Sequence, residues 1–117
     1  GQGAGGGGPD LAAALIEAKI RSRPEEDADL DALAASHGIS PSTFRRQWRS
    51  LFADSPALHI QKLRMGMARR LLIESDARIG EIARKVGFSD VLYFSRRFRL
   101  ATGLSASEYR KRFRLKP

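Results

Sequence analysis

Arginine and aromatic residues recur at one spacing in two separate parts of this chain of 117 residues. Fifty positions separate the members of each pair, which are Phe44 and Phe94, Arg46 and Arg96, Trp48 and Phe98, and Arg49 and Arg99. The planar guanidinium of arginine forms paired hydrogen bonds with the O6 and N7 atoms of guanine, and it also binds phosphate. The spacing therefore predicts recognition of nucleic acid at two places.

A second repeat lies just before each arginine pattern. Residues 33–40, Leu-Ala-Ala-Ser-His-Gly-Ile-Ser, and residues 82–89, Ile-Ala-Arg-Lys-Val-Gly-Phe-Ser, carry apolar, Ala, Gly, apolar and Ser residues in the same order, at an offset of 49. This order is typical of a helix-turn-helix, in which Gly supplies left-handed backbone and small Ala34 and Ala83 let two helices approach. Ser40 and Ser89 are predicted to cap the recognition helix that follows each turn.

Helical spacing divides each recognition helix into an inward and an outward face. In the first helix, Phe44, Trp48 and Leu51 are predicted to be buried, Ser42, Arg46 and Arg49 to point away, and Arg45 to lie on the flank. In the second, Phe94, Phe98 and Ala101 are predicted to be buried, Leu92, Arg96 and Arg99 to point away, and Val91 and Ser95 to lie on the flanks.

The outward residues form the predicted DNA interface. An outward arginine is ordinarily just solvated, but Arg46 and Arg96 occupy equivalent positions in two copies, so we assign them to bases. Val91 and Leu92 have no hydrogen-bonding group and either contact thymine methyl groups or pack against the preceding helix. The base-binding prediction comprises Ser42, Arg45, Arg46, Arg49, Val91, Leu92, Ser95 and Arg96. The phosphate-binding prediction comprises Ser40, Thr43, Lys62, Arg64, Ser89, Arg97, Arg99 and Arg110.

The charge is distributed unevenly along the chain. The net charge is +8, but residues 1–40 hold three basic and seven acidic side chains, whereas residues 41–117 hold eighteen basic and six acidic ones. A basic segment of this kind suits binding to a polyanion, because neutralised phosphates release counterions. Judged by charge alone, it is equally compatible that the Lys and Arg side chains only face solvent on the helix surfaces and bind nothing.

Composition excludes several other classes of protein. There is no Cys, and His37 and His59 are the only histidines, so we predict no disulfide, no metal site and no cofactor. No apolar run is long enough for a membrane span, which makes a soluble cytoplasmic protein the default and predicts no membrane partner. We find no paired carboxylates in a plausible pocket, no Ser/His/Asp arrangement and no phosphate-binding loop, so we predict that the chain is not an enzyme.

From residue 10 onward the apolar residues recur at helical spacing. This periodicity predicts an all-α fold of seven helices, with two homeodomain-like helix-turn-helix subdomains joined by a central helix. Residues 1–9 are expected to form a disordered Gly-rich linker or a cloning remnant, and residues 10–117 a DNA-binding domain. Within that domain, residues 10–55 and 74–113 form the two subdomains, 56–73 the linker helix and 114–117 a basic tail.

Several details of these helices are also predicted. The first helix, 10–22, should face inward with Leu11, Leu15 and Ala18, and Asp29 should cap the second. The linker helix carries a stripe of Leu63, Met67 and Leu71, flanked by Ile60 and Leu72, and Met65 and Met67 fill the core. Helices are expected at 79–86 and 90–102. The last helix opens with the capping box Ser105-Ala106-Ser107-Glu108, and Tyr109 anchors it.

The residues from about 11 to 112 resemble the DNA-binding domain of the AraC/XylS family of bacterial transcription regulators. The resemblance lies in 68–72 (Ala-Arg-Arg-Leu-Leu), in 79–90 (Ile-Gly-Glu-Ile-Ala-Arg-Lys-Val-Gly-Phe-Ser-Asp), in 93–99 (Tyr-Phe-Ser-Arg-Arg-Phe-Arg) and in 103–110. It implies that both recognition helices enter successive major grooves of double-stranded DNA. The resemblance also implies which residues face the bases, by their positions in the family motif: Ser42, Arg45, Arg46, Val91, Leu92, Ser95 and Arg96.

The resemblance also carries expectations about the whole protein. Family members usually have a separate effector-sensing or dimerising domain, so we expect this chain to be the C-terminal domain of a longer effector-responsive regulator, with RNA polymerase as an expected partner. A short single-domain member is the minor alternative. The competing function is non-specific binding of nucleic acid or anionic surfaces, which would show similar affinity for any polyanion.

Overall fold

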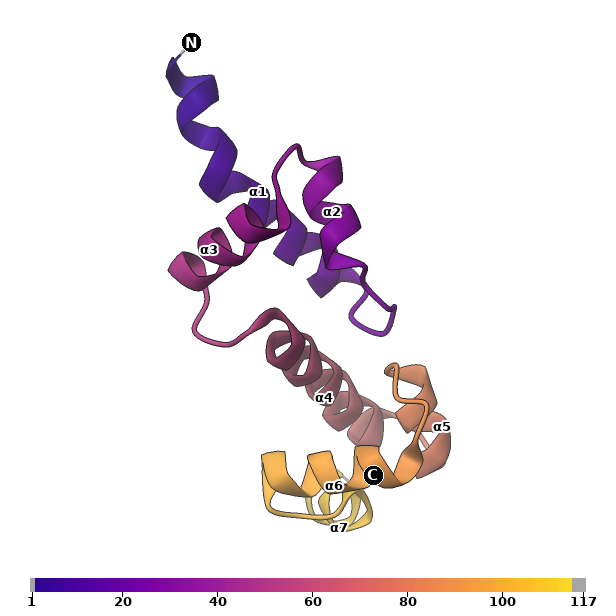
Figure 1. The fold of residues 1–117 in the computed structure, drawn as a ribbon. Coiled ribbons are helices and arrows are strands. Elements are labelled where there is room, and N and C mark those ends of the chain that lie inside the picture. Colours follow the sequence, from indigo (N-terminus) through magenta and orange to yellow (C-terminus); the bar gives the residue numbers. More distant parts are fainter. Residues whose placement is uncertain (1, 115–117) are drawn as a thin grey trace. The chain divides into compact units, whose positions relative to one another are not determined.

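The computed structural model describes residues 2–114, and side chains from residue 11 onward. Every regular element in this part of the chain is a helix, as predicted (Figure 1). The seven helices are α1 (Gln2–Ser22), α2 (Leu30–Ser36), α3 (Pro41–Leu51), α4 (Pro56–Glu74), α5 (Ile79–Lys85), α6 (Val91–Thr102) and α7 (Ala106–Phe113). They form two compact units, residues 1–60 and 61–117, whose boundary falls within α4. Of the predicted basic tail, 115–117 lie outside the described residues.

In the first unit, α1 packs against α2 and α3. The predicted inward face of α1 is wrong: Leu11, Leu15 and Ala18 are exposed, and the buried residues are Ala12, Ala13, Ile16, Glu17 and Ile20. The small side chains of Ala12 and Ala13 allow close helix packing at this face, and Ile16 and Ile20 supply its larger buried side chains. The helix also begins at Gln2, eight residues before the predicted start at Asp10.

A polar and aromatic cluster closes the first unit. Glu17, only 8% exposed, accepts hydrogen bonds from Arg21 Nη2 at 2.6 Å and His59 Nε2 at 2.7 Å. The His59 ring meets the Trp48 ring edge-on, with centroids 5.1 Å apart, and the Trp48 Nε1–H donates to the Asp54 carbonyl at 2.8 Å. These contacts join α1 and the start of α4 to α3, and they fix the inward face of α3.

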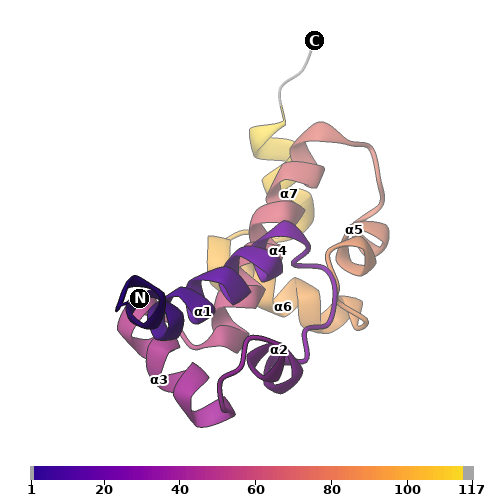
Figure 2. The same cartoon turned by 90° about the horizontal axis from the view of Figure 1, so that it is seen from above.

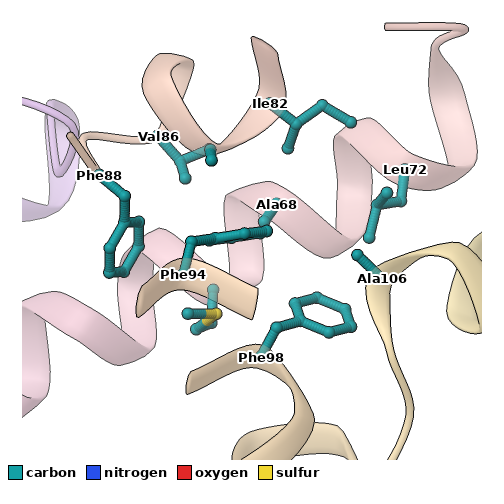
Figure 3. Close-up of a cluster of buried hydrophobic side chains, with 10 residues drawn as sticks. Ala68, Leu72, Ile82, Val86, Phe88, Phe94, Phe98 and Ala106 are labelled. Carbon is teal, nitrogen blue, oxygen red and sulfur yellow. The ribbon is translucent and has the colours of Figure 1, made fainter. Parts of the chain in front are cut away.

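In the second unit, α5, α6 and α7 gather about the later residues of α4 (Figure 2). Its core contains Phe94 and Phe98 of α6 between side chains of the other three helices (Figure 3). The labelled partners are Ala68, Leu72, Ile82, Val86, Phe88 and Ala106. Tyr109 meets Phe98 edge-on at 5.4 Å and packs on this core, which confirms its predicted anchoring role.

The buried stripe of α4 differs from the predicted one. Met65, Ala68 and Leu72 are buried, whereas Leu63, Met67 and Leu71 are only half-buried. Met65 lies in the core and Met67 packs against it, so the prediction that both methionines fill the core is confirmed. The small side chain of Ala68 lets neighbouring helices pack close to this face of α4, beside Met65 and Leu72. No helix among the described residues has both the length and the apolar character that crossing a membrane requires.

Candidate nucleic-acid interface

The two predicted turns adopt the same backbone conformation. Gly38 has φ of 75° and Gly87 has φ of 102°, the left-handed region predicted for both. The Ile39 N–H donates to the Ala34 carbonyl at 3.0 Å, and the Phe88 N–H donates to the Ala83 carbonyl at 2.9 Å. The Gly38 N–H also donates to the Ala35 carbonyl at 2.9 Å, and the Gly87 N–H to the Arg84 carbonyl at 3.0 Å, which completes a Schellman motif at the end of α2 and of α5. Each turn is thus a helix C-terminus closed by glycine.

The small residues before each turn are fully buried. Ala34 in α2 and Ala83 in α5 both have 0% exposure, and α2 packs against α3 as α5 packs against α6. An alanine at this position keeps the two helices of each motif close together. The prediction from the repeated Ala is therefore confirmed in both units.

The starts of the two recognition helices differ by one residue. Ser40 is the N-cap of α3, and its Oγ accepts from the Thr43 N–H at 3.1 Å, as predicted. Ser89 is not a cap: the N-cap of α6 is Asp90, whose Oδ1 accepts from the N–H groups of Leu92 and Tyr93 at 2.9 and 3.2 Å.

The extra residue explains why the turns repeat at an offset of 49 and the helices at 50. Mapping Ser40 forward by 50 gives Asp90, so the helical offset could have identified the cap. The carboxylate of Asp90 occupies amides at the start of α6, and its negative charge disfavours the phosphate contact that was predicted at Ser89.

The inward face of α3 is largely as predicted. Phe44 and Trp48 are buried, with exposures of 2% and 1%. Leu51, however, is 44% exposed, and Gln47 is buried in its place. Leu51 is the last residue of α3, and a helical wheel gives the direction of a side chain but not whether a neighbour extends that far along the axis.

The inward face of α6 shows the same pattern. Phe94 and Phe98 are fully buried, and their rings lie 5.8 Å apart. Ala101 was predicted to be buried with them but is exposed. It lies in the last turn of α6, where the core of the second unit has ended. Both recognition helices are thus anchored by two aromatic residues four positions apart.

The outward faces carry the predicted base-binding residues. On α3, Ser42, Arg45, Arg46 and Arg49 are all exposed. On α6, Leu92, Arg96 and Arg99 are exposed, whereas Val91 and Ser95 are half-buried. No ion pair or side-chain hydrogen bond ties Arg46 or Arg96 to another residue within the described part of the chain. Both guanidinium groups therefore point from a rigid helix to solvent.

Two predicted phosphate ligands have partners inside the second unit. The Nη1 of Arg64 donates to the Gly87 carbonyl at 3.2 Å, which ties α4 to the second turn. Arg110 donates from Nε to the Leu72 carbonyl at 2.9 Å and from Nη2 to the Ser75 carbonyl at 3.0 Å, which satisfies the C-terminal end of α4. We therefore leave Arg64 and Arg110 out of the proposed interface.

The other predicted phosphate ligands lie at least partly at the surface. Ser40, Lys62 and Ser89 are exposed, and Thr43 and Arg97 are half-buried. Arg99 is exposed but lies 3.6 Å from Glu108 of α7.

Glu108 belongs to the predicted capping box, which is present: Ser105 N–H donates to Glu108 Oε1 at 2.8 Å, and Glu108 N–H donates to Ser105 Oγ at 3.0 Å. The backbone and the hydroxyl of Ser105, and then the charge of Arg99, lower the pKa of Glu108.

Known proteins resemble this chain along most of its length. A family model described as a helix-turn-helix domain matches residues 33–112. The MmsAB operon regulatory protein of Pseudomonas aeruginosa is 32% identical over 99 residues, which cover 85% of this chain and 32% of that protein. The transcriptional activator RhaS of Escherichia coli O139:H28 is 31% identical over 97 residues, which cover 83% and 35%. The chain thus spans about a third of the length of both regulators.

Solved structures match the fold as well. The C-terminal domain of AraT, a response regulator from Geobacillus stearothermophilus, has a TM-score of 0.80 at 27% identity, and the match covers 90% of this chain and 88% of that one. The DNA-binding domain of the transcriptional factor AdpA, solved with a target DNA, has a TM-score of 0.79 at 31% identity, with coverage of 87% and 92%. The chain belongs to the AraC-type helix-turn-helix family of DNA-binding transcription regulators.

Proposed function

We propose that this domain binds double-stranded DNA sequence-specifically, with α3 and α6 in successive major grooves on one face of the duplex. The observation that carries the proposal is the pair Arg46 and Arg96, exposed at equivalent positions of two recognition helices that are built alike. A guanidinium directed from a helix in the major groove reaches guanine O6 and N7. The AdpA domain, which was solved in complex with a target DNA, supports the binding of DNA by this domain.

The other residues of the predicted interface, which are exposed or half-buried, have supporting roles in the proposal. Arg45 and Ser42 flank Arg46 on α3 and contact neighbouring bases. Arg49 of α3 and Ser95 of α6 extend the base-contacting surface of each helix. Contacts from Ser40, Thr43, Lys62 and Arg97 to phosphates set the register without reading sequence. The basic charge of residues 41–117 adds affinity for any duplex, and the exposed arginines select among duplexes.

The length of the matched regulators supports a larger protein around this domain. We infer that the domain acts in the bacterial cytoplasm, in a longer regulator with an effector-sensing part that lies outside this chain. Activation through RNA polymerase is the role we propose for that regulator. The activator RhaS, which this chain matches over a third of its length, supports this part of the proposal.

Selection of bound duplexes from a randomised library tests sequence specificity directly. We expect an enriched motif with two base clusters about one helical turn apart. Affinity for the selected duplex and for a scrambled duplex is then measured by fluorescence anisotropy at physiological salt. Equal affinity for the two duplexes would refute sequence-specific binding by this domain.

Substitutions at Arg46 separate base reading from charge. Arg46→Ala should cost about 1 to 3 kcal/mol on the selected duplex and relax the preference at one base position. Arg46→Lys is the matched control, because it keeps the charge but loses the planar pair of donors, so it should also relax that preference. Lys62→Ala should weaken binding to selected and scrambled duplexes equally. Equal losses on both duplexes for Arg46→Ala would show that Arg46 reads no base.

The second candidate function is non-specific binding of polyanions, which the charge of residues 41–117 favours. A non-specific binder has an affinity that depends almost only on the salt concentration. The logarithm of its binding constant falls linearly with the logarithm of the salt concentration, and the slope is proportional to the number of phosphates neutralised. Titrations of the selected duplex, the scrambled duplex and heparin at several salt concentrations decide between the two. If the domain binds DNA sequence-specifically, its affinity for the selected duplex should exceed that for the scrambled duplex at every salt concentration.

A further inference from the structure

The first turn of α6 holds two apolar residues with different environments. Val91 is half-buried and packs on the core of the second unit, and its Cγ2 lies 3.8 Å from where a Cβ on Gly80 of α5 would stand. Leu92 is 71% exposed. Packing against α5 therefore accounts for Val91 but not for Leu92, and the two residues cannot share one role.

Leu92 lies beside the polar residues that are proposed to read bases. It precedes Ser95 by three positions and Arg96 by four, and side chains at these spacings are neighbours on a helix surface. The equivalent position on α3 is Ser42, which can donate and accept hydrogen bonds. The two recognition helices thus present different chemistry at matched positions, polar on α3 and apolar on α6.

In the major groove the C5-methyl group of thymine is the apolar feature of the base edges. A leucine side chain has no donor or acceptor, so it distinguishes bases there through this group. We propose that Leu92 packs against the C5-methyl group of a pyrimidine in the second half-site, next to the guanine read by Arg96. This inference rests on the proposed function, because it requires α6 to lie in the major groove.

It follows that this position selects the methyl group rather than the base pair. Thymine and 5-methylcytosine both carry a methyl group at C5, whereas uracil and cytosine have hydrogen there. Removing one buried methyl-sized group from the contact should weaken binding about fourfold. The same factor should appear in the A·T context, as thymine against uracil, and in the G·C context, as 5-methylcytosine against cytosine.

The experiment starts from the selected duplex. Each thymine of the second half-site is replaced in turn by uracil, and affinity is measured by fluorescence anisotropy. At the thymine whose replacement weakens binding, duplexes with cytosine and 5-methylcytosine opposite guanine are then compared. We expect one such thymine, a loss of about fourfold with uracil, and a similar gain from cytosine to 5-methylcytosine.

Two variants assign the effect to Leu92. The Leu92→Ala variant should bind the thymine and uracil duplexes with nearly equal affinity, and likewise the 5-methylcytosine and cytosine duplexes. Its thermal unfolding should match that of the wild type because the Leu92 side chain is exposed. Leu100→Ala is the matched control: Leu100 is 76% exposed on the same helix but lies in the turns furthest from the α6 N-terminus, so both preferences should remain. Uracil in the first half-site, which faces Ser42, should not show the Leu92-dependent loss.

Three results would overturn the inference while leaving sequence-specific binding intact. They are a second half-site without a selected thymine, uracil substitutions that leave affinity unchanged throughout that half-site, and a methyl preference that persists in Leu92→Ala. If the selected and scrambled duplexes bind equally, the proposed function fails, and the inference fails with it.

Discussion

At the scale of single residues, Glu17 shows how a carboxylate is kept inside a small helical unit. Its burial raises the pKa, but the hydrogen bonds from Arg21 and from His59 of α4 outweigh that effect. The pKa of Glu17 therefore lies below its ordinary value. A carboxylate that is held in this way stabilises the folded state only while it is ionised.

The pH dependence of stability tests this description. Because the folded pKa is below the unfolded value, the contribution of Glu17 is complete above the unfolded pKa of about 4.5 and is lost as the pH falls through the folded pKa. We expect Glu17→Gln to lower the thermal midpoint at pH 7 and the difference from wild type to shrink at acid pH. Circular dichroism melts between pH 3 and 7 measure this. Glu26→Gln, at an exposed pair with Arg23, is the control and should change little. A Glu17→Gln deficit independent of pH would contradict the expectation.

Arginines mark the limit of prediction at this scale. Arg46 and Arg64 are both basic residues on helices, and the sequence assigned both to DNA. The structure leaves Arg46 exposed, whereas Arg64 donates to a carbonyl 23 positions away. An arginine side chain is long enough to reach the backbone of another element, and helical periodicity gives only the direction of its Cβ. Contacts of this kind follow from tertiary packing, which the repeat pattern does not contain.

At the scale of elements, strong local signals predicted most of the fold. Caps at Asp29, Ser40 and Ser105 and the two turn glycines fixed where helices start and stop, and all were found as predicted. The inward face of α1 was predicted wrongly because apolar residues surround that helix almost completely, so the wheel has no clear direction. The recognition helices, with arginines opposite aromatic residues, had a clear direction: the inward residues that proved exposed, Leu51 and Ala101, lie in their last turns, and Gln47 is the buried residue that was missed.

The glycines of the turns and of α4 give an element-scale prediction. Gly38 has φ of 75° with no atom within 4 Å of an added Cβ, so Gly38→Ala is penalised by backbone conformation alone, at about 1 to 2 kcal/mol. Gly66 lies inside α4, where an added Cβ would meet only the Nη2 of Arg69 at 3.9 Å. Gly66→Ala should therefore stabilise by about 0.5 to 1 kcal/mol. Chemical denaturation measures both. Changes of the same sign would contradict this account of the turn.

At the scale of the whole molecule, the chain combines two helix-turn-helix units of similar construction. Residues 41–117, with eighteen basic and six acidic side chains, include both recognition helices. One recognition helix contacts only a few base pairs, so a single unit has limited specificity. In the proposed function, the two units bind adjacent sites and the second contact is intramolecular, which raises affinity without any new type of contact. The proposed function thus depends on the link between the units as much as on the arginines.

The spacing of the two half-sites tests that link. The 19 residues of α4 span about 28 Å, less than the roughly 34 Å of one DNA turn. Inserting five base pairs between the half-sites turns the second groove to the opposite face and should reduce affinity at least about tenfold, to that of a duplex with one half-site. Inserting ten restores the face but adds a full turn of about 34 Å between the half-sites, more than the whole length of α4, so affinity should stay low. Competition titrations with the three duplexes measure this. Recovery at ten base pairs would mean that the two units are joined flexibly, and equal affinity for all three duplexes would mean that only one unit reads DNA.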